Sequence, residues 1–291
     1  MIHFFLKSVG EGKFGTQREF FEKKVDPGSV VFDANMPPLV WGVKYEPVAC
    51  MLYCKRNRTN VQDFGLLKHP TIPHIGASPD GISADGIMVE IKCPWRRVPD
   101  GTVPKQYMYQ IQFQLDVCDL DECDYLEVKL AEYDDEAEFV ADAFIAHGTD
   151  AMYSANGNEK GVLIEYVVGA DRKYEYNDVV TTATVAQALE WRDAALASLP
   201  ADAENVYVTY WRVETLGVIR VYRDREFLEA KYPEIEAVWE KVVAYRADRG
   251  LYEQEVVSAK KTRAKKVTAT YVRSAKQPEG LFVPVCCLGD D

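Results

Sequence analysis

Apolar positions follow a helical repeat soon after a pair of prolines at 37 and 38. The repeat advances in steps of four, three and four residues through Trp41, Tyr45, Val48 and Leu52. This spacing places the four side chains on one face and predicts a helix with a buried stripe. Pro47 lies inside the repeat, so the helix is expected either to kink there or to restart with proline in its first turn.

Alternating apolar and polar residues predict a β-hairpin over residues 72–93, with its turn at Asp85 and Gly86. Its second strand places Glu90 and Lys92 on the same face, about 6–7 Å apart. A helix is predicted over 104–117, where Pro104 suits the first turn. Further strands are predicted at 125–130, 161–168, 171–176 and 205–222, and further helices at 17–24, 182–199 and 224–248.

Strands and helices alternate along the chain, which indicates an α/β fold. The 291 residues are 47% hydrophobic and 27% charged, as expected for a globular protein rather than a disordered or fibrous one. Because no Pro/Gly/Ser-rich linker interrupts them, we expect one domain over 1–257, with a motif-bearing core at about 37–130. The sequence contains no run of eighteen apolar residues, so no membrane span is predicted, and no signal peptide is recognised. An intracellular protein is therefore expected.

The net charge of −12 argues, taken alone, against a nucleic-acid partner, but the charges are unevenly placed. Between positions 116 and 142 there are twelve acidic residues and one lysine, which predicts a solvated acidic face. Residues 258–291 form a basic tail with seven Lys or Arg between positions 260 and 276. This tail is expected to be flexible and to serve either DNA binding or a localisation or partner-binding role.

Seven cysteines lie without regular spacing at 50, 54, 93, 118, 123, 286 and 287. An odd number without a repeated interval is a poor disulfide framework and indicates free thiols in a reducing compartment. An iron–sulfur site built from the pairs 50/54 and 118/123 is the alternative interpretation.

The residues most suggestive of chemistry are Asp80, Glu90 and Lys92. A hairpin would place Asp80 on the strand beside the one that carries the other two. Two carboxylates and an ammonium in a small area suit a divalent metal and a reacting phosphate, and oxygen ligands favour Mg²⁺ or Mn²⁺ over zinc. The alternative interpretation is an ordinary Glu–Lys pair on a solvent-facing strand.

Two predicted helices carry further candidates. Glu46 lies between Gly42 and Ala49, whose small side chains leave room for a water molecule or a phosphate beside the carboxylate. Gln110 and Gln114 are one helical turn apart, and an amide can hold a water or a phosphate oxygen. Exposed polar helix faces would look the same, so each signal is weak alone.

In chain order, the four motifs are Trp41-Gly42-x-x-x-Glu46, then Gly76-Ala77-Ser78-Pro79-Asp80-Gly81, then Val89-Glu90-Ile91-Lys92-Cys93-Pro94, then Tyr109-Gln110-Ile111-Gln112. Together they resemble the lambda-exonuclease/YqaJ-type viral recombinase branch of the PD-(D/E)xK nucleases, over about residues 39–130. The resemblance implies a restriction-endonuclease-like core, a central mixed β-sheet flanked by helices, here with a C-terminal α/β extension. It also implies a metal-dependent exonuclease that digests one strand of duplex DNA from its 5′ end in recombination.

The resemblance assigns a role to each site residue. Asp80, Glu90 and the carbonyl of Ile91 would bind Mg²⁺, with one or two ions and with Mn²⁺ as a substitute. Glu46 would bind or position a second metal or its water, Lys92 would activate the water, and Gln110 would support the site. The expected DNA contacts are the basic residues Lys55, Arg56, Arg58, Arg96 and Arg97.

Other features of the resemblance stay open. The family usually holds the 5′-phosphate with an N-terminal arginine and a Thr/Ala-Ser segment, and here Arg18 and Ser8 give no convincing match. An endonuclease of the same fold and a catalytically silent DNA-binding or recombination scaffold are therefore the alternatives. The expected partners are linear duplex DNA, a single-strand annealing protein and further copies of the chain, in the host cytoplasm or nucleus if the protein is viral.

Overall fold

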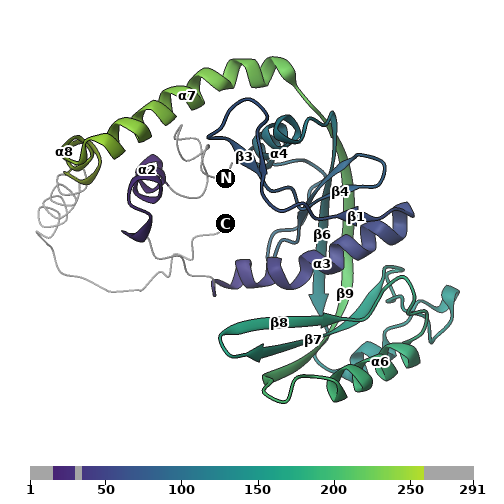
Figure 1. Ribbon diagram of the computed structural model, residues 1–291. Coiled ribbons are helices and arrows are strands. Elements are labelled where there is room, and N and C mark those ends of the chain that lie inside the picture. Colours follow the sequence, from purple (N-terminus) through teal and green to yellow (C-terminus); the bar gives the residue numbers. More distant parts are fainter. Residues whose placement is uncertain (1–15, 30–34, 259–291) are drawn as a thin grey trace, which may run out of the picture. The chain divides into compact units, whose positions relative to one another are not determined.

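The computed structural model describes residues 16–29 and 35–258, which divide into two compact units. One unit contains residues 35–223, and the other combines 16–29 with 224–258. Each is described by itself (Figure 1). The expected basic tail lies outside the described residues except for Ser258, and the expectation of one functional domain over 1–257 stays a prediction.

The larger unit is built on a mixed seven-stranded sheet with the order β1-β4-β5-β6-β9-β7-β8. Strands β5 and β6 are parallel, and the other neighbours are antiparallel. The strands are β1 (Val61–Gln62), β4 (Gly81–Ser83), β5 (Met88–Lys92), β6 (Glu122–Glu132), β7 (Lys160–Val168), β8 (Asp171–Tyr176) and β9 (Glu204–Tyr222). The predicted α/β fold with a central mixed sheet is confirmed, and the C-terminal strands β7, β8 and β9 extend this same sheet.

Helix α3 (Pro37–Asn57) and helix α4 (Lys105–Cys118) cover the sheet and form two separate cores. The α3 stripe packs on Val89 and Ile91 of β5, whereas the α4 stripe packs on Met88 of β5. Alternate residues of a strand face opposite sides of a sheet, so the two helices lie on opposite faces. Both faces of β5 are therefore covered, and Glu90 is buried rather than on a solvent-facing strand.

Helix α3 is continuous through Pro47, so the predicted restart at that residue does not occur. The predicted hairpin is also shorter than expected. Strand β4 pairs with β5 around the turn that contains Gly86 (φ 78°), but β3 (Gly76–Ala77) pairs instead with β2 (Leu67–Lys68) in a separate two-stranded sheet.

Most acidic residues of the stretch 116–142 are exposed, as its composition predicted, but two of them are buried. Asp124 and Glu127 on β6 are 5% and 4% exposed, because β6 is a central strand. Their charges are met by basic side chains: Arg220 binds Asp124, and Arg97 binds Glu127. Local charge counting misses these two residues because their partners are distant in sequence.

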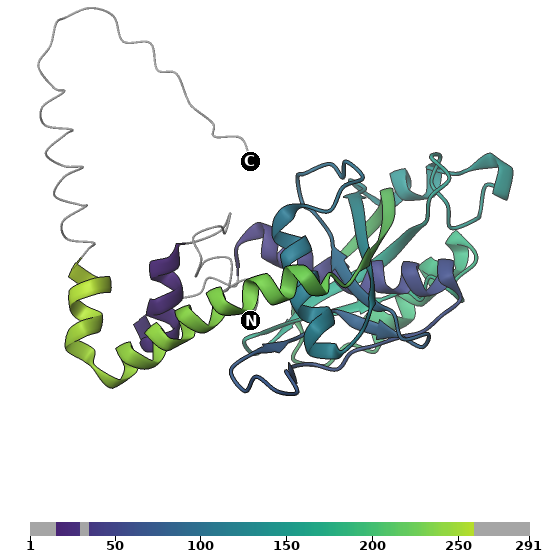
Figure 2. The same ribbon diagram turned by 90° about the horizontal axis from the view of Figure 1, so that it is seen from above.

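The remaining helices complete the two units. In the larger unit α6 (Val185–Ala197) packs against β7 through Val185 and Ala188, and the short α5 is Glu136–Ala141. In the smaller unit α2 (Gln17–Val25) lies beside the C-terminal half of α7 (Arg225–Ala247), with α8 (Arg249–Tyr252) following (Figure 2). Short helical turns at Pro27–Ser29, Ile145–His147 and Glu253–Val257 complete the description. Among the described residues, no helix has the length and apolar character needed to cross a membrane.

Candidate active site

Asp80, Glu90 and Lys92 come together at the β4–β5 pair. Glu90 and Lys92 belong to β5, and Asp80 immediately precedes β4, whose first residue lies opposite Val89. The backbone N–H of Ile91 donates a 2.6 Å hydrogen bond to Oδ2 of Asp80. Antiparallel pairing of two short strands thus brings the separated carboxylates into one cluster.

The ammonium of Lys92 lies between the two carboxylates. Its Nζ donates a hydrogen bond to Oε1 of Glu90 and another of 3.0 Å to the carbonyl oxygen of Ile91. Oδ2 of Asp80 is 3.8 Å from the same nitrogen. The carbonyl that the resemblance assigns to metal binding therefore points into the cluster.

The cluster has more negative than positive charge. Glu90 is fully buried, and its Oε2 atom has no hydrogen-bond partner. Burial and the charge of Glu90 raise the pKa of Asp80 to about 7, against the opposing effect of Lys92. For Lys92, burial favours the neutral amine, but Glu90 and Asp80 prevail and raise its pKa, so the side chain stays an ammonium.

Glu46 shares this electrostatic field without a direct bond to the cluster. It lies on the exposed side of α3, and partial burial of its carboxylate raises the pKa, as does the charge of Glu90, against the opposing effect of Lys92. The thiol of Cys50 is close enough to Glu46 and Asp80 for both to raise its pKa, after the larger effect of burial, to about 12. Cys50 is thus a protonated, structural thiol at the edge of the site.

Helix α4 supports the cluster from the face of the sheet to which Glu90 and Lys92 point. The side-chain amide of Gln114 donates a 3.2 Å hydrogen bond to the carbonyl of Ser78, which fixes the segment leading to Asp80. Nζ of Lys92 lies 5.2 Å from the ring centroid of Tyr107, within the range of a cation–π interaction. Gln110 makes no hydrogen bond to the cluster, but its Oε1 is buried and without a partner.

Gly81 holds Asp80 in place for a reason that the sequence did not reveal. A Cβ atom on this residue would lie 2.2 Å from Cγ1 of Val61, so β1 can pair with β4 only when this position is glycine. The glycine thus serves a close strand–strand approach.

The residues present fit a hard divalent cation. Mg²⁺ is usually held by one or two carboxylates and keeps several water molecules, and Asp80, Glu90 and the Ile91 carbonyl provide such oxygens. The unpartnered Oε2 of buried Glu90 is the atom that most needs a cation or hydrogen-bond donor. In the described part of the chain, no three His, Cys, Asp or Glu side chains form a ready metal-ligand set, which also gives no support to an iron–sulfur site.

The expected DNA contacts on α3 are partly engaged within the protein. Arg56 binds Oε2 of Glu159 at 2.5 Å, and the ammonium of Lys55 lies 5.2 Å from the ring centroid of Tyr153. Arg58, which follows α3 with a positive φ of 53°, is exposed. Among these three residues, Arg58 is the one whose charge is most available to a ligand.

The two arginines that follow β5 differ from each other. Arg97 binds the buried carboxylate of Glu127, which also accepts a 2.9 Å hydrogen bond from Tyr125. The guanidinium of Arg96 is exposed and lies 4.3 Å from the ring centroid of Trp95. A cavity of about 370 Å³ adjoins Tyr125 and Glu127 on the face of the sheet that carries Glu90 and Lys92.

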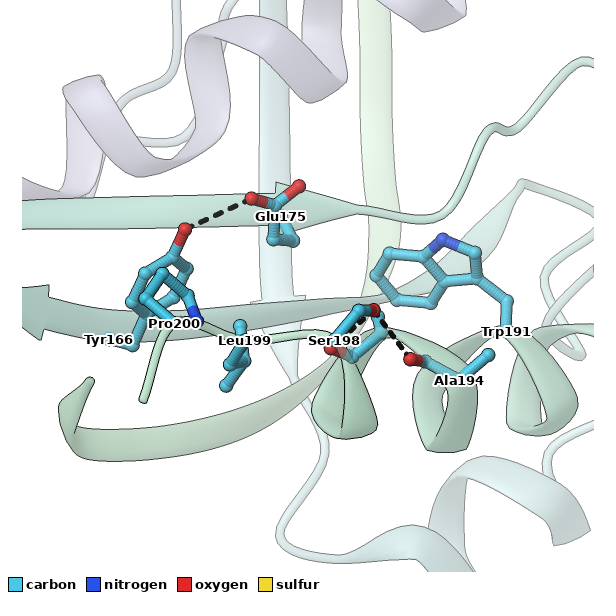
Figure 3. Close-up of a pocket in the computed structure, with 8 residues that line it drawn as sticks. Tyr166, Glu175, Trp191, Ala194, Ser198, Leu199 and Pro200 are labelled. Carbon is cyan, nitrogen blue, oxygen red and sulfur yellow. Dashed lines mark hydrogen bonds between the residues drawn. The ribbon is translucent and has the colours of Figure 1, made fainter. Parts of the chain in front are cut away.

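A second cavity, of about 380 Å³, lies between α6 and the β7–β8 hairpin (Figure 3). The hydroxyl of Tyr166 donates a 3.1 Å hydrogen bond to Glu175 at its wall, and Trp191 and Leu199 supply apolar surface. None of the predicted site residues lines it.

A family model described as the YqaJ-like viral recombinase domain matches residues 11–121 of this chain. The matched segment contains all four motifs of the active-site cluster. Residues 11–121 are therefore similar to a YqaJ-like viral recombinase domain, which confirms the resemblance identified from the sequence.

Other comparisons extend further along the chain. An uncharacterized protein of Acanthamoeba polyphaga mimivirus is 31% identical over 240 residues, which cover 70% of this chain but only 43% of that protein. The structure of an alkaline exonuclease from Laribacter hongkongensis is similar with a TM-score of 0.47 and 18% identity, over 89% of this chain and 91% of that one. A phage-related exonuclease from Haemophilus somnus gives a TM-score of 0.39 and 12% identity, with 87% of each chain covered.

Proposed function

We propose that this protein is a Mg²⁺-dependent deoxyribonuclease, and specifically an exonuclease that digests duplex DNA in the 5′→3′ direction during recombination. The observation that carries the proposal is the buried Glu90 carboxylate, which has one unpartnered oxygen and lies beside Asp80 and the Lys92 ammonium. The similarity of residues 11–121 to a YqaJ-like viral recombinase domain supports the same activity.

In this proposal Asp80, Glu90 and the carbonyl of Ile91 hold the ion, and Glu46 serves a second ion or a water molecule. A bound Mg²⁺ would act as a Lewis acid toward a phosphate oxygen and lower the pKa of a water ligand. The chain's own contribution is a fixed geometry, because Asp80 is tied to the Ile91 N–H and its segment to Gln114.

Lys92 acts as a hydrogen-bond donor and as a positive charge. Its raised pKa keeps it protonated, so it orients the attacking water and offsets charge that develops on the phosphate, rather than accepting a proton. The ring of Tyr107 restricts where this ammonium can move. The segment that carries the basic residues 96 and 97 follows β5 directly, so DNA phosphates bound there would lie close to the catalytic cluster.

The test compares two forms of one DNA in Mg²⁺: linear duplex with 5′-phosphates and covalently closed circles. An exonuclease releases nucleotides from the linear form and spares the circle, whereas an endonuclease of the same fold cuts both. Linear duplex labelled at either the 5′ or the 3′ end reports the polarity. Failure to degrade any form in Mg²⁺ or Mn²⁺ would contradict the proposed activity.

A further inference from the structure

The segment that carries Asp80 is paired on both sides of that residue. After it, β4 pairs with β1, with Gln62 opposite Ile82. Before it, β3 pairs with β2, with Leu67 opposite Ala77. The two ladders share one register, because the second pair lies five residues further along the one strand and five residues back along the other. The loop between β1 and β2 is therefore anchored on both sides of the catalytic carboxylate.

This loop consists of residues 63–66, which belong to no strand. When the common register is continued through the loop, Phe64 takes the position opposite Asp80. On the other side, the register of β4 with β5 places Glu90 in the position opposite the same aspartate. The loop thus lies beside the catalytic cluster, and Phe64 is in line with its two carboxylates.

The loop holds two large apolar residues at the surface. Phe64 and Leu66 are 45% and 60% exposed, and Gly65 between them has a φ of 61°, which favours glycine. Oδ1 of Asp63 accepts a 2.7 Å hydrogen bond from the N–H of Gly65, which fixes the turn. Cδ1 of Leu66 lies 3.5 Å from where a Cβ of Gly76 would be, so this side chain lies against β3. A turn fixed in this way presents its aromatic ring with little cost of ordering on binding.

The charges around the loop favour an uncharged group at its tip and phosphates further out. Burial raises the pKa of Glu46, and the charge of Asp63 adds to this effect, against the opposing effect of Lys92. The Asp63 carboxylate is therefore close to the active site, where it repels a phosphate from the loop. Arg58, which precedes β1, and Lys68, which ends β2, are exposed cations that attract the DNA backbone to the outer ends of the two strands.

A nucleobase is the ligand whose chemistry matches an exposed phenyl ring beside a phosphate site. Each base is flat and uncharged and lies one sugar away from its phosphate, and aromatic side chains stack on bases of any sequence. Inside a duplex both faces of a base are covered by its neighbours, whereas the last base pair of a linear end has one face free. The ring can therefore stack on a DNA end without unstacking any base. A partner protein bound at the same loop would instead obstruct the cluster.

We propose that residues 63–66 form a base-binding subsite, in which the ring of Phe64 stacks on the free face of a terminal base while the adjoining phosphate is held at Asp80 and Glu90. Leu66 extends the apolar surface of this subsite. The inference rests on the proposed nuclease function and deepens it, because the stack gives the site a physical reason to prefer DNA ends to the interior of a duplex.

Binding measured without digestion tests the subsite in the full-length chain. Protein with Glu90→Gln is titrated in Mg²⁺ against a short linear duplex and against the same duplex with both ends closed by nucleotide loops. Adding Phe64→Ala should weaken binding to the linear duplex by about five- to a hundredfold, the range for loss of one base–aromatic stack, and leave binding to the closed duplex unchanged. Phe64→Leu, which keeps an apolar side chain without a ring, should lose nearly as much, and Phe64→Trp should bind as the parent does.

Tyr207→Ala is the matched control, since it removes another exposed aromatic side chain (60% exposed) where β9 pairs with β7, away from β4. It should bind both DNAs as the parent does. With Glu90 intact, Phe64→Ala should raise KM for the linear duplex in the same proportion as its affinity falls and change kcat by no more than about twofold, because stacking contributes equally to the bound substrate and the transition state.

Three results would each overturn the proposal: an unchanged affinity of Phe64→Ala for the linear duplex, an equal loss on the closed duplex, or an equal loss in Tyr207→Ala. The first of these, found in a chain that digests DNA normally, would contradict the subsite and leave the nuclease function intact. Absence of digestion by the unsubstituted chain would contradict the nuclease function, while an end-selective loss of binding in Phe64→Ala would still support the subsite.

Discussion

Two buried acidic clusters lie on neighbouring strands of one sheet, and they differ in how completely their charges are satisfied. In the first, Asp124 of β6 uses both oxygens: Oδ1 accepts from Arg220, and Oδ2 accepts a 2.7 Å bond from the hydroxyl of Tyr53. In the second, Glu90 of β5 shares the single ammonium of Lys92 with Asp80 and keeps one oxygen without a partner.

The difference teaches how a structural ion pair can be told from a reactive site. An acid whose oxygens all have partners stabilises the fold and has no need of a ligand. A buried carboxylate with a free oxygen, next to an acid whose pKa is raised to about 7, is a place where added positive charge would be favourable. Burial and residue type alone would not have separated Asp124 from Glu90, which are 5% and 0% exposed.

The largest expected effect comes from Glu90→Gln, which removes the excess charge but keeps the shape. DNA cleavage in Mg²⁺ should fall by about a thousandfold or more, since a metal ligand contributes several kcal/mol to transition-state stabilisation. The melting temperature should stay the same or rise, because a buried, incompletely paired charge is removed. Initial cleavage rates test the expected loss of activity, and thermal unfolding of the purified protein tests the expected stability. A large decrease in the melting temperature would show that Glu90, like Asp124, mainly stabilises the fold.

Lys92→Arg sharpens the role of the ammonium. The planar guanidinium cannot occupy the compact position between Glu90, Asp80 and the Ile91 carbonyl, so cleavage should fall about a hundredfold, nearly as far as in Lys92→Ala. Rates for both variants at saturating DNA give the answer. Recovery of most activity in the arginine variant would show that a general positive charge is sufficient and that water positioning is not its role.

For Asp124→Asn we expect the opposite result, a loss of stability without a loss of activity. Arg220 loses a charged partner and Tyr53 a charged acceptor, so the free energy of unfolding should decrease by about 2 kcal/mol, with the partial exposure of Arg220 limiting the loss. Cleavage per folded molecule should be unchanged. Denaturant unfolding measures the stability, and cleavage rates measured well below the unfolding transition give the activity of the folded protein. Loss of activity without loss of stability would contradict a purely structural role for Asp124.

Arg56→Ala gives the smallest effect and tests whether an expected DNA contact is mainly structural. Burial alone would raise the pKa of Glu159, but hydrogen bonds from Arg56 and the backbone prevail and lower it below the usual 4.5. The folded state thus favours the ionised form, so the pair stabilises the protein above about pH 4.5, and this stabilisation is lost as pH falls through the lowered pKa.

At neutral pH Arg56→Ala should therefore reduce stability by about 1 kcal/mol or less, because the guanidinium is partly exposed. The difference from the unsubstituted protein should shrink in acid. Unfolding curves at several pH values measure this, and salt titrations of DNA affinity with Arg58→Ala as the comparison show which arginine contacts phosphate. A clear reduction of the salt dependence by Arg56→Ala alone would assign that contact to Arg56.

The sequence was sufficient for most elements because their apolar repeats are strong. The helices α3, α4, α6 and α7 and the strands from β5 to β9 lie close to their predicted positions. The hairpin at 72–93 was predicted too long, since residues 76 and 77 pair with a strand that has only two residues and no pattern of its own. Such short pairings depend on tertiary contacts, which alternation cannot reveal.

The sequence predicted which residues form the candidate site, but not how their charges are paired or which contacts fix them. Spacing placed Asp80, Glu90 and Lys92 together, and helical repeats placed Gln114 on the supporting helix. Only the folded arrangement shows that Gln114 of α4 fixes the carbonyl of Ser78. It also shows that the contact with Val61 requires glycine at position 81. The distant partners of Asp124 and Glu127 likewise explain why these two acids of the otherwise largely exposed stretch can be buried.

The most direct measurement of the central claim is the rate of linear duplex digestion as Mg²⁺ is added to metal-free protein, for the unsubstituted chain, Glu90→Gln and Asp124→Asn. The unsubstituted chain and Asp124→Asn should show no digestion without metal and a saturable rise with Mg²⁺. Glu90→Gln should stay near the background at every Mg²⁺ concentration. Full activity of Glu90→Gln, or digestion by the unsubstituted chain that persists in excess EDTA, would contradict a metal-dependent nuclease site at Asp80, Glu90 and Lys92.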